Sequence, residues 1–387
     1  MANRVRYACE WTPVGVGVAA RRALRALLSV EDPDLDIVWE PLGPAPLGRA
    51  SVGDGVDQWL RDLRGPPVAG EILVHHVVPG AWNEVARAVA PVHQIGHSVF
   101  ELDDIPHAWL DEMSEVDEFW VPTEWNRRAF QRAFDRPVHV VPHVVIDIEP
   151  DSIPLSIPDD LAIVSLVSAW DWRKRPDRAI DAFCRAFTSA DSVALVVKTS
   201  PYCVEWPGGD VGVIESIERI VQEFRDPPIV FYDTGTWTDA QMLGLAQRSA
   251  CSLSLTSSEG WGLGAFDAAS LGTPVIITGF GGQVDYLGEN YPGLLPYRRV
   301  PTAHRNRRLF EVGTEWAYAD LDAAVDLLRS VIGGSASDLS ARAESLAPEL
   351  RDRYSPQRVG TQLSELLRAA RLSGSGRRRL GRGPGRP

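Results

Sequence analysis

Hydrophobic and polar positions along this chain follow two alternating patterns. Short apolar runs rich in Val, Ile and Leu recur along the sequence, and longer segments with apolar residues every three or four positions separate them. The short runs predict buried strands, and the spacing of about 3.6 residues predicts helices. Strands that alternate with helices are typical of parallel sheets, so we predict an α/β fold.

This alternation occurs in two series. In the first, we expect strands at 5–9, 37–40, 72–76, 94–100, 119–122 and 138–141, with helices at 18–28 and 124–134. In the second, we expect strands at 162–168, 193–198, 229–232, 250–255 and 274–278, with helices at 178–187, 213–224, 239–247 and 264–271. After Thr302 we expect two or three helical segments, the last near 356–372. We therefore predict two Rossmann-like doubly wound domains that face each other across a ligand-binding cleft at the carboxyl ends of their strands.

The domain limits follow from a segment that interrupts the pattern. Residues 147–160 are rich in Pro and Asp and show no period, which predicts a linker. The expected organisation is a first domain over 1–146, a second domain over 161–354, a C-terminal helix over 355–372 and a basic disordered tail over 373–387.

Composition narrows the class of protein. The 387 residues suffice for two cores, and a net charge of −13 argues against broad nucleic-acid binding. The sequence shows neither an apolar run of about 20 residues nor the pattern of a signal peptide, so we expect a cytoplasmic protein. The four cysteines lack the spacing of metal ligands, as is usual in a reducing compartment.

The tail has a charge of the opposite sign. It carries Arg377, Arg378, Arg379, Arg382 and Arg386 among Gly and Pro residues. Such a segment is suited to peripheral contact with the anionic inner face of a membrane. A solvated tail without function is the simpler interpretation.

The most informative motif is a glycine-rich turn between a predicted strand and a predicted helix. It reads Glu259-Gly260-Trp261-Gly262-Leu263, and Asp267 follows Glu259 by eight residues. Backbone N–H groups and the positive end of a helix can bind phosphates or polar sugar groups. The two carboxylates can then hold different parts of one elongated ligand. A lone Glu at this place would be interpreted more simply as an acid that matches the helix dipole.

Cations occur at the ends of two other predicted strands. Arg173 and Lys174 precede a helix, Lys198 ends an apolar run, and the chain contains no other lysine than these two. Fixed cations at strand ends can stabilise negative charge on a bound ligand. A chance distribution in an arginine-rich chain is the competing explanation for the rarity of lysine.

Taken together, these motifs resemble the donor site of the glycosyltransferase 4 family, in which Glu-Gly-Phe-Gly-Leu and a second Glu precede a Gly-x-Pro-Val-Ile strand. The resemblance covers most of residues 70–330 and implies a GT-B fold. It implies that Glu259 contacts the donor sugar, that Gly260 to Leu263 lie beside the diphosphate and that Asp267 binds the ribose. The chain departs from the family at Asp267, where Glu is usual, and at Ala169, where Arg is common.

Candidate residues for the acceptor side lie in the first domain, which holds seven of the eight histidines. His97 and Glu101 belong to a segment that also resembles this family, and His97 is a further catalytic candidate. His75 is another candidate on the acceptor side. Gly15, between the first strand and helix, and Gly282, after a later strand, are candidates for close approach of the backbone to the donor.

The resemblance implies a retaining glycosyltransferase that uses a nucleotide-diphosphate sugar, with UDP or GDP as the leading nucleotides and no metal or other cofactor. The acceptor hydroxyl can belong to a glycan, a lipid-linked sugar or a small molecule. A sugar-nucleotide or glycan-binding module without catalysis is the alternative, and an epimerase or a phosphorylase is a third possibility. Asp32, Asp34 and Asp36 offer carboxylates for a metal, but the intervening Pro favours a loop.

Overall fold

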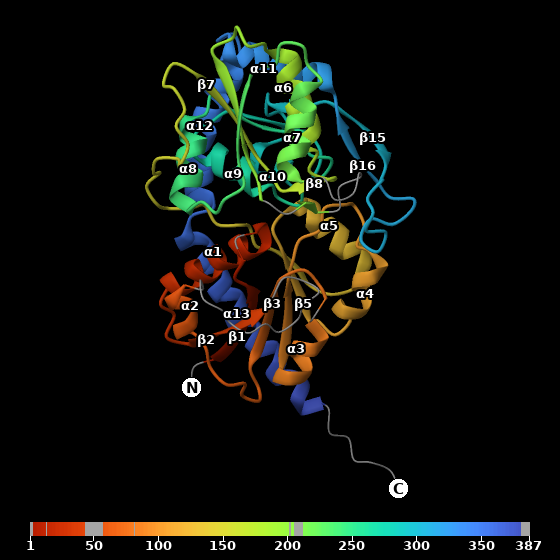
Figure 1. Ribbon diagram of the computed structural model, residues 1–387. Helices are drawn as coiled ribbons and strands as arrows, with labels where there is room; N and C mark the ends of the chain where they lie inside the picture. Colours follow the sequence, from red (N-terminus) through yellow and green to blue (C-terminus); the bar gives the residue numbers. More distant parts are fainter. Residues whose placement is uncertain are drawn as a thin grey trace. The chain divides into compact units, whose positions relative to one another are not determined.

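A computed structural model describes residues 3–12, 14–42, 57–80, 82–200, 203–204 and 212–380, without the side chains of 203–204 and 371–380 (Figure 1). The chain divides into two units. Unit 1 is formed by Met1–Val144 together with Tyr354–Pro387, and unit 2 is Val145–Arg353. The predicted linker at 147–160 belongs to unit 2, and the predicted C-terminal helix belongs to unit 1.

Unit 1 is built on a parallel sheet of six strands in the order β2-β1-β3-β4-β5-β6. The strands are β1 (Asn3–Glu10), β2 (Leu35–Leu42), β3 (Ile72–His76), β4 (His93–His97), β5 (Glu118–Val121) and β6 (Val138–Val140). The helices between them are α1 (Gly15–Ser29), α2 (Gln58–Asp62), α3 (Trp82–Val89), α4 (His107–Met113) and α5 (Glu124–Ala133). Strands covered on both faces need apolar residues at almost every position, and β3 is buried throughout.

The last helix of the chain completes the core of unit 1. Helix α13 (Pro356–Leu380) places Val359, Leu363 and Leu367 in the same buried cluster as Leu24 and Leu27 of α1. The helix continues into the tail that the sequence analysis expected to be disordered. Extending an existing helix adds a hydrogen bond for each residue that is fixed, so Ser and Gly at 373–376 do not end it. Arg382 and Arg386 of the tail lie outside the described residues.

Gly360 tests the packing of these two helices. A Cβ atom at Gly360 would lie 2.1 Å from the carbonyl oxygen of Ala26. In open space, Gly→Ala stabilises a helix by about 1 kcal/mol. Here we expect Gly360→Ala to lower the free energy of unfolding by about 2 kcal/mol, because the backbones of α1 and α13 must separate. Denaturant unfolding checks this, with Glu365→Ala on the exposed face of α13 as the control. Equal stability of both variants would contradict the close packing.

Unit 2 repeats the architecture with the strand order β11-β9-β7-β12-β13-β14. Its strands are β7 (Ala162–Val167), β9 (Val193–Lys198), β11 (Ile229–Asp233), β12 (Cys251–Ser254), β13 (Val275–Thr278) and β14 (Leu294–Leu295). Its helices are α6 (Pro176–Ala186), α7 (Val213–Gln222), α8 (Asp239–Arg248), α9 (Leu263–Ser270), α10 (Gln283–Leu287), α11 (Leu321–Ile332) and α12 (Ser337–Arg353). The short strands β8 (Trp170–Asp171) and β10 (Cys203–Val204) pair separately.

An antiparallel hairpin, β15 (Tyr297–Pro301) and β16 (Glu315–Ala319), is attached to unit 2. The helical segments predicted after Thr302 are confirmed as α11, α12 and α13, but the hairpin was not predicted. Exposed arginines on β15 and in the loop interrupt the alternation of apolar and polar residues by which a strand is recognised in a sequence. The remaining strands and helices that the sequence predicted are confirmed, except that β4 ends at His97 rather than at residue 100. The carbonyl of Phe100 accepts a hydrogen bond from the Asn126 side chain of α5, so the chain has left the sheet by this point.

Candidate functional site

The candidate site lies at the carboxyl ends of β7 and β12 in unit 2. A tight turn after β8 presents Arg173 and Lys174, and Asp171 fixes this turn. The Asp171 carboxylate accepts the backbone N–H of Arg173 at 2.7 Å, and the Asp171 carbonyl accepts the N–H of Lys174 at 3.0 Å. Arg175 then adopts the left-handed conformation, with φ of 51°, and Pro176 begins α6. Asp171 cannot be recognised as part of the site from the sequence, because its role depends on a backbone hydrogen bond.

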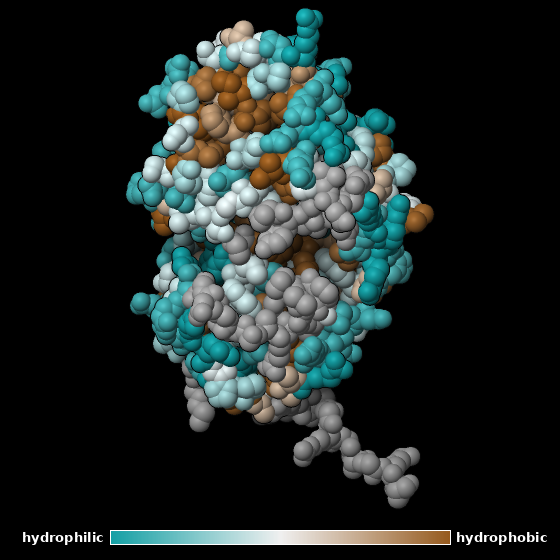
Figure 2. Space-filling model, viewed as in Figure 1, coloured by the Kyte–Doolittle hydropathy of each residue, from teal (hydrophilic) through white to brown (hydrophobic). Residues whose placement is uncertain are grey.

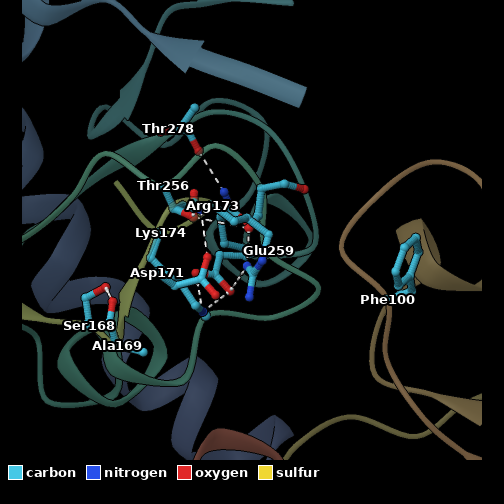
Figure 3. A network of polar contacts seen from close by, with 12 residues as sticks. Phe100, Ser168, Ala169, Asp171, Arg173, Lys174, Thr256, Glu259 and Thr278 are labelled. Atoms are coloured by element: carbon cyan, nitrogen blue, oxygen red, sulfur yellow. Dashed lines mark hydrogen bonds and ion pairs between the residues drawn. The ribbon is translucent and has the colours of Figure 1, made fainter. Parts of the chain in front are cut away.

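Glu259 is the centre of the polar network (Figure 3). The Nζ atom of Lys174 lies 2.6 Å from both carboxylate oxygens of Glu259. Nη1 of Arg173 donates to the Ser258 carbonyl at 2.5 Å and lies 3.4 Å from Oε2 of Glu259. Only 6% of Glu259 is exposed. The structure therefore brings together three of the residues that the sequence selected, at a buried carboxylate held by two cations.

The charge state of Glu259 follows from two opposing effects. Burial raises the pKa of the Glu259 carboxyl, but the nearby Lys174 and Arg173 lower it by more, so the pKa lies below its usual value. The Asp171 carboxyl behaves in the same way. Burial raises its pKa, and His304 and Arg173 together lower it by more. Both groups are therefore anions at neutral pH. The cluster places these two carboxylates next to the cations of Arg173 and Lys174.

Two glycines bring the backbone close to Glu259. The N–H of Gly282 donates to the Glu259 carbonyl at 2.7 Å. Gly281 has a φ of +112°, and a Cβ atom there would lie 2.4 Å from the same carbonyl. Gly262 also has a positive φ, +85°, and precedes the first turn of α9. The glycine-rich turn is thus held in place by a second loop, in which Gly282 contacts the backbone of Glu259.

Gly281 offers a matched test of this arrangement. We expect Gly281→Ala to destabilise unit 2 by more than about 3 kcal/mol and to displace Glu259, because both the backbone conformation and the available space exclude a side chain. Gly288 has a similar φ of +90°, and a methyl group there would meet nothing within 4 Å. Gly288→Ala should therefore show the conformational strain alone, about 1–3 kcal/mol. Denaturant unfolding of both variants measures the difference, and equal effects would contradict the close approach.

The other residues of the glycine-rich turn and of helix α9 differ in their surroundings. The Trp261 indole packs against Phe266 and Tyr286, with ring centroids 4.9 and 5.0 Å away, so it supports the turn by packing. Leu263 is the first residue of α9. Asp267 is buried farther along α9, at 9% exposure. Gly260 is buried in the turn itself.

The contacts of Lys198 are with residues other than Glu259. At the end of β9, its Nζ donates to the carbonyls of Thr199 and Gly235 at 2.9 and 2.6 Å and lies 3.7 Å from Asp233. It also lies 5.3 Å from the centre of the Trp237 ring. Burial lowers the pKa of Lys198, and Asp233 offsets part of this effect. Arg173, rather than Lys198, is therefore the second cation beside Glu259. Ala169, where the family resemblance would place an arginine, lies apart from this cluster in Figure 3.

In unit 1, His97 belongs to a buried cluster that sequence reasoning did not find. Its ring stacks on that of His76 at 3.6 Å, and the Tyr7 hydroxyl lies 2.5 Å from Nδ1 of His76 and 3.5 Å from Nδ1 of His97. The His143 ring lies 6.5 Å from that of His76. These residues come from β1, β3, β4 and the segment after β6. The signal in the sequence that could have revealed this cluster is that all four residues lie toward the same end of the predicted sheet.

The remaining candidates of unit 1 have other positions. His75 is fully buried, stacks on Trp82 at 5.0 Å and lies 3.3 Å from Oε1 of Gln94, within the packing of α3 on the sheet. Glu101 is half-buried after β4. Gly15 is the first residue of α1 rather than part of a loop, which corrects the sequence interpretation. Its neighbour Gly17 makes the close approach, since a Cβ there would lie 2.4 Å from the Thr12 carbonyl.

The described residues offer no candidate for a metal site or a membrane span. No group of three or more His, Cys, Asp or Glu side chains there is placed to hold a metal ion. None of the described helices is long and apolar enough to cross a membrane.

Comparison with known proteins identifies the fold. No protein family and no curated protein matches the sequence. The α,α-trehalose 6-phosphate synthase of Burkholderia multivorans is similar in structure, with a TM-score of 0.64 at 13% identity over 96% of this chain and 100% of that one. The N-terminal domain of the Candida albicans trehalose-6-phosphate phosphatase gives 0.63 at 11% identity, covering 97% of each chain.

A third similar structure contains a nucleotide. A mutant of S. aureus TarM, in complex with fondaparinux, α-GlcNAc-glycerol and UDP, gives a TM-score of 0.53 at 15% identity. The match covers 77% of this chain but only 55% of TarM. With two six-stranded parallel sheets that match GT-B structures over nearly its full length, the protein has the GT-B fold.

Proposed function

We propose that the protein is a glycosyltransferase that moves a sugar from a nucleotide-diphosphate donor to an acceptor hydroxyl with retention of configuration. The observation that carries this proposal is the buried Glu259 carboxylate, paired with Lys174 and Arg173 at the carboxyl ends of parallel strands. Ligands of open α/β sheets bind at this edge. The resemblance of the surrounding turn to the glycosyltransferase 4 family supports a sugar nucleotide as the ligand.

The two cations suit the chemistry of the leaving group. In sugar transfer, the bond between the anomeric carbon and the diphosphate oxygen breaks, and negative charge develops on the diphosphate. Lys174 and Arg173 would stabilise this charge, while Glu259 would exchange part of its ion pair for hydrogen bonds from sugar hydroxyls. The acceptor oxygen forms the new bond on the same face of the sugar, and its proton passes to the departing diphosphate.

The other parts of the donor and the acceptor are assigned to further residues of both units. Asp267 would bind the ribose, and the Gly260–Leu263 turn would lie along the diphosphate, as the family resemblance implies. In unit 1, Nε2 of His97 is buried without a hydrogen-bond partner among the described residues. A buried polar atom of this kind favours a bound hydroxyl group. We therefore propose that the acceptor binds near His97 and Glu101. TarM binds UDP, which makes UDP-sugars the first donors to test.

The second candidate function is a sugar-nucleotide-binding module without catalysis. It is favoured by Ala169 and Asp267, which depart from the family signature. It is also favoured by the similarity to the N-terminal domain of a trehalose-6-phosphate phosphatase, since a fold does not determine a reaction.

Release of nucleoside diphosphate from a panel of UDP- and GDP-sugars separates these functions. The assay would include a mixture of simple glycosides, glycerol derivatives and lipid-linked sugars as acceptors. The transferase proposal predicts release that depends on one donor and falls on Glu259→Gln, with Glu365→Gln as a surface control. Donor binding without release in every combination would select the binding module. Release that Glu259→Gln leaves unchanged would contradict the proposed site.

A further inference from the structure

The β15–β16 hairpin differs in charge from the rest of the chain. Between Tyr297 and Ala319 lie five arginines and two glutamates, in a protein whose net charge is −13. All five arginines are exposed: Arg298, Arg299, Arg305, Arg307 and Arg308. Figure 1 shows the hairpin at one side of unit 2, and Figure 2 shows hydrophilic and hydrophobic atoms side by side at its outer end. None of these arginines has a part in the proposed reaction.

The loop that carries three of these arginines is folded rather than irregular. On its inner side, His304, Phe310 and Trp316 are buried, and the His304 and Phe310 rings lie 4.4 Å apart. Thr302 and Thr314 close the base of the loop through a backbone bond of 2.9 Å. Because this small core fixes the loop, Arg305, Arg307 and Arg308 are displayed on its outer side by a defined scaffold.

Apolar side chains accompany the positive charge. Val312 in the loop is 85% exposed, which is the highest value among the exposed large hydrophobic residues, and Tyr297 on β15 is 42% exposed. A polyanion such as a nucleic acid attracts arginines but gains nothing from an exposed valine. The surface of an anionic bilayer offers both an attractive potential and an apolar layer.

We propose that this hairpin is a peripheral binding surface for an anionic lipid bilayer, with Val312 and Tyr297 entering the interface and the arginines contacting lipid head groups. The hairpin is also joined to the candidate site. The N–H of Ala317 donates to the Ser257 carbonyl at 2.9 Å, and Nη1 of Arg175 donates to the Tyr318 hydroxyl at 2.7 Å. Binding would therefore hold the unit 2 site close to the lipid surface, where an acceptor attached to lipid would be concentrated. This last consequence rests on the proposed function, but membrane binding itself does not.

Sedimentation of the full chain with lipid vesicles tests the proposal without any donor. We expect binding to vesicles of phosphatidylcholine with about 30% phosphatidylserine, little binding to phosphatidylcholine alone, and weakening at high salt. The variant Arg305→Ser/Arg307→Ser/Arg308→Ser should lose on the order of 100-fold in partitioning. The control Arg87→Ser/Arg128→Ser/Arg219→Ser changes the net charge equally at sites outside the hairpin and should keep binding.

A second pair of variants tests the apolar contribution. Val312→Asp should weaken vesicle binding by about tenfold or more, because it removes the inserted side chain and adds a repelled charge. Val68→Asp, at a residue that is 48% exposed in unit 1, is the matched control. Both sites are exposed, so neither change should prevent folding, and thermal unfolding verifies this.

Four results would overturn the proposal. They are absence of vesicle binding, equal binding to neutral vesicles, equal losses in the hairpin and control variants, and loss only when the tail residues Arg377, Arg378 and Arg379 are replaced. Hairpin-dependent binding to heparin or RNA without vesicle binding would likewise exclude the bilayer and identify a soluble polyanion as the partner.

Discussion

Lowering the pH from about 7 to about 5 is expected to destabilise unit 1 by several kcal/mol, because four buried histidines must remain neutral in the folded state. Burial lowers the pKa of His75 to about 4. Burial, with a contribution from Arg22, lowers the pKa of His143 to about 3. Burial and the neighbouring rings hold the pKa values of His76 and His97 well below the usual value. Tyr7 adds no charge that would favour protonation, since burial raises its pKa.

The direction of the effect follows from proton binding. In the unfolded chain these histidines have a pKa of about 6.5, so the unfolded state binds more protons than the folded state below that pH. Their contribution is complete above about pH 6.5 and falls with decreasing pH by up to about 1.4 kcal/mol per pH unit for each histidine. The loss continues until the folded pKa is reached, about 4 for His75 and about 3 for His143.

Denaturant unfolding at several pH values measures this slope. His97→Gln and His143→Gln should each reduce the slope by about one proton between pH 6.5 and pH 5. His107 is exposed at the start of α4, so His107→Gln serves as the control for a histidine outside the buried cluster. A wild-type slope no steeper than that of both cluster variants would show that the histidines are already charged or accessible in the folded protein.

Replacing Lys174 by alanine is expected to have the largest effect on catalysis. The change removes the closer of the two cations beside Glu259 and leaves a buried carboxylate with only Arg173. We expect sugar transfer to slow by about 100-fold to 1000-fold, as when one group that stabilises a transition-state anion is removed. We also expect the free energy of unfolding of unit 2 to fall by about 3 kcal/mol, because the Glu259 carboxylate is buried and would lose its closer cation.

A compensating variant separates these two effects. Lys174→Met/Glu259→Gln removes both charges, so it should regain most of the stability lost in Lys174→Ala while remaining inactive. Lys198→Met changes the other lysine, whose contacts are with Thr199, Gly235 and Asp233. It should leave the Glu259 ion pair intact. Rates from nucleoside diphosphate release and stabilities from unfolding provide both readouts. Wild-type activity in the double variant would contradict a role for the ion pair in transfer.

The sequence predicted well those features that depend on local pattern. The runs at 72–76 and 193–198 coincide with β3 and β9, because strands buried on both faces must be apolar throughout. The turn at Glu259 was found because its glycines and carboxylates are close in sequence. Contacts between residues that lie far apart in the sequence were harder to predict. The choice between Arg173 and Lys198 as the second cation depends on how a tight turn at Asp171 directs the side chains, and this does not appear in residue order.

Two features depended on contacts that no local pattern encodes. The cluster of Tyr7, His76, His97 and His143 forms because four separate segments of unit 1 end at the same edge of a sheet. The β15–β16 hairpin was missed because its outer positions carry arginines, while its apolar residues pack in a loop core around His304. In both cases, tertiary packing rather than propensity selects the conformation.

Binding of a nucleoside diphosphate beside Lys174 can be measured directly, because the chain contains only two lysines. Labelling with [ε-¹³C]lysine gives signals from Lys174 and Lys198 alone, which Lys174→Arg and Lys198→Arg would assign. The protein would then be titrated separately with UDP, GDP, ADP, TDP and CDP. We predict that one nucleotide shifts the Lys174 signal in a saturable manner and that Glu259→Gln changes this shift. If no nucleotide moves the Lys174 signal, or if only the Lys198 signal responds, the diphosphate does not bind at the Glu259 ion pair and the proposed site is wrong.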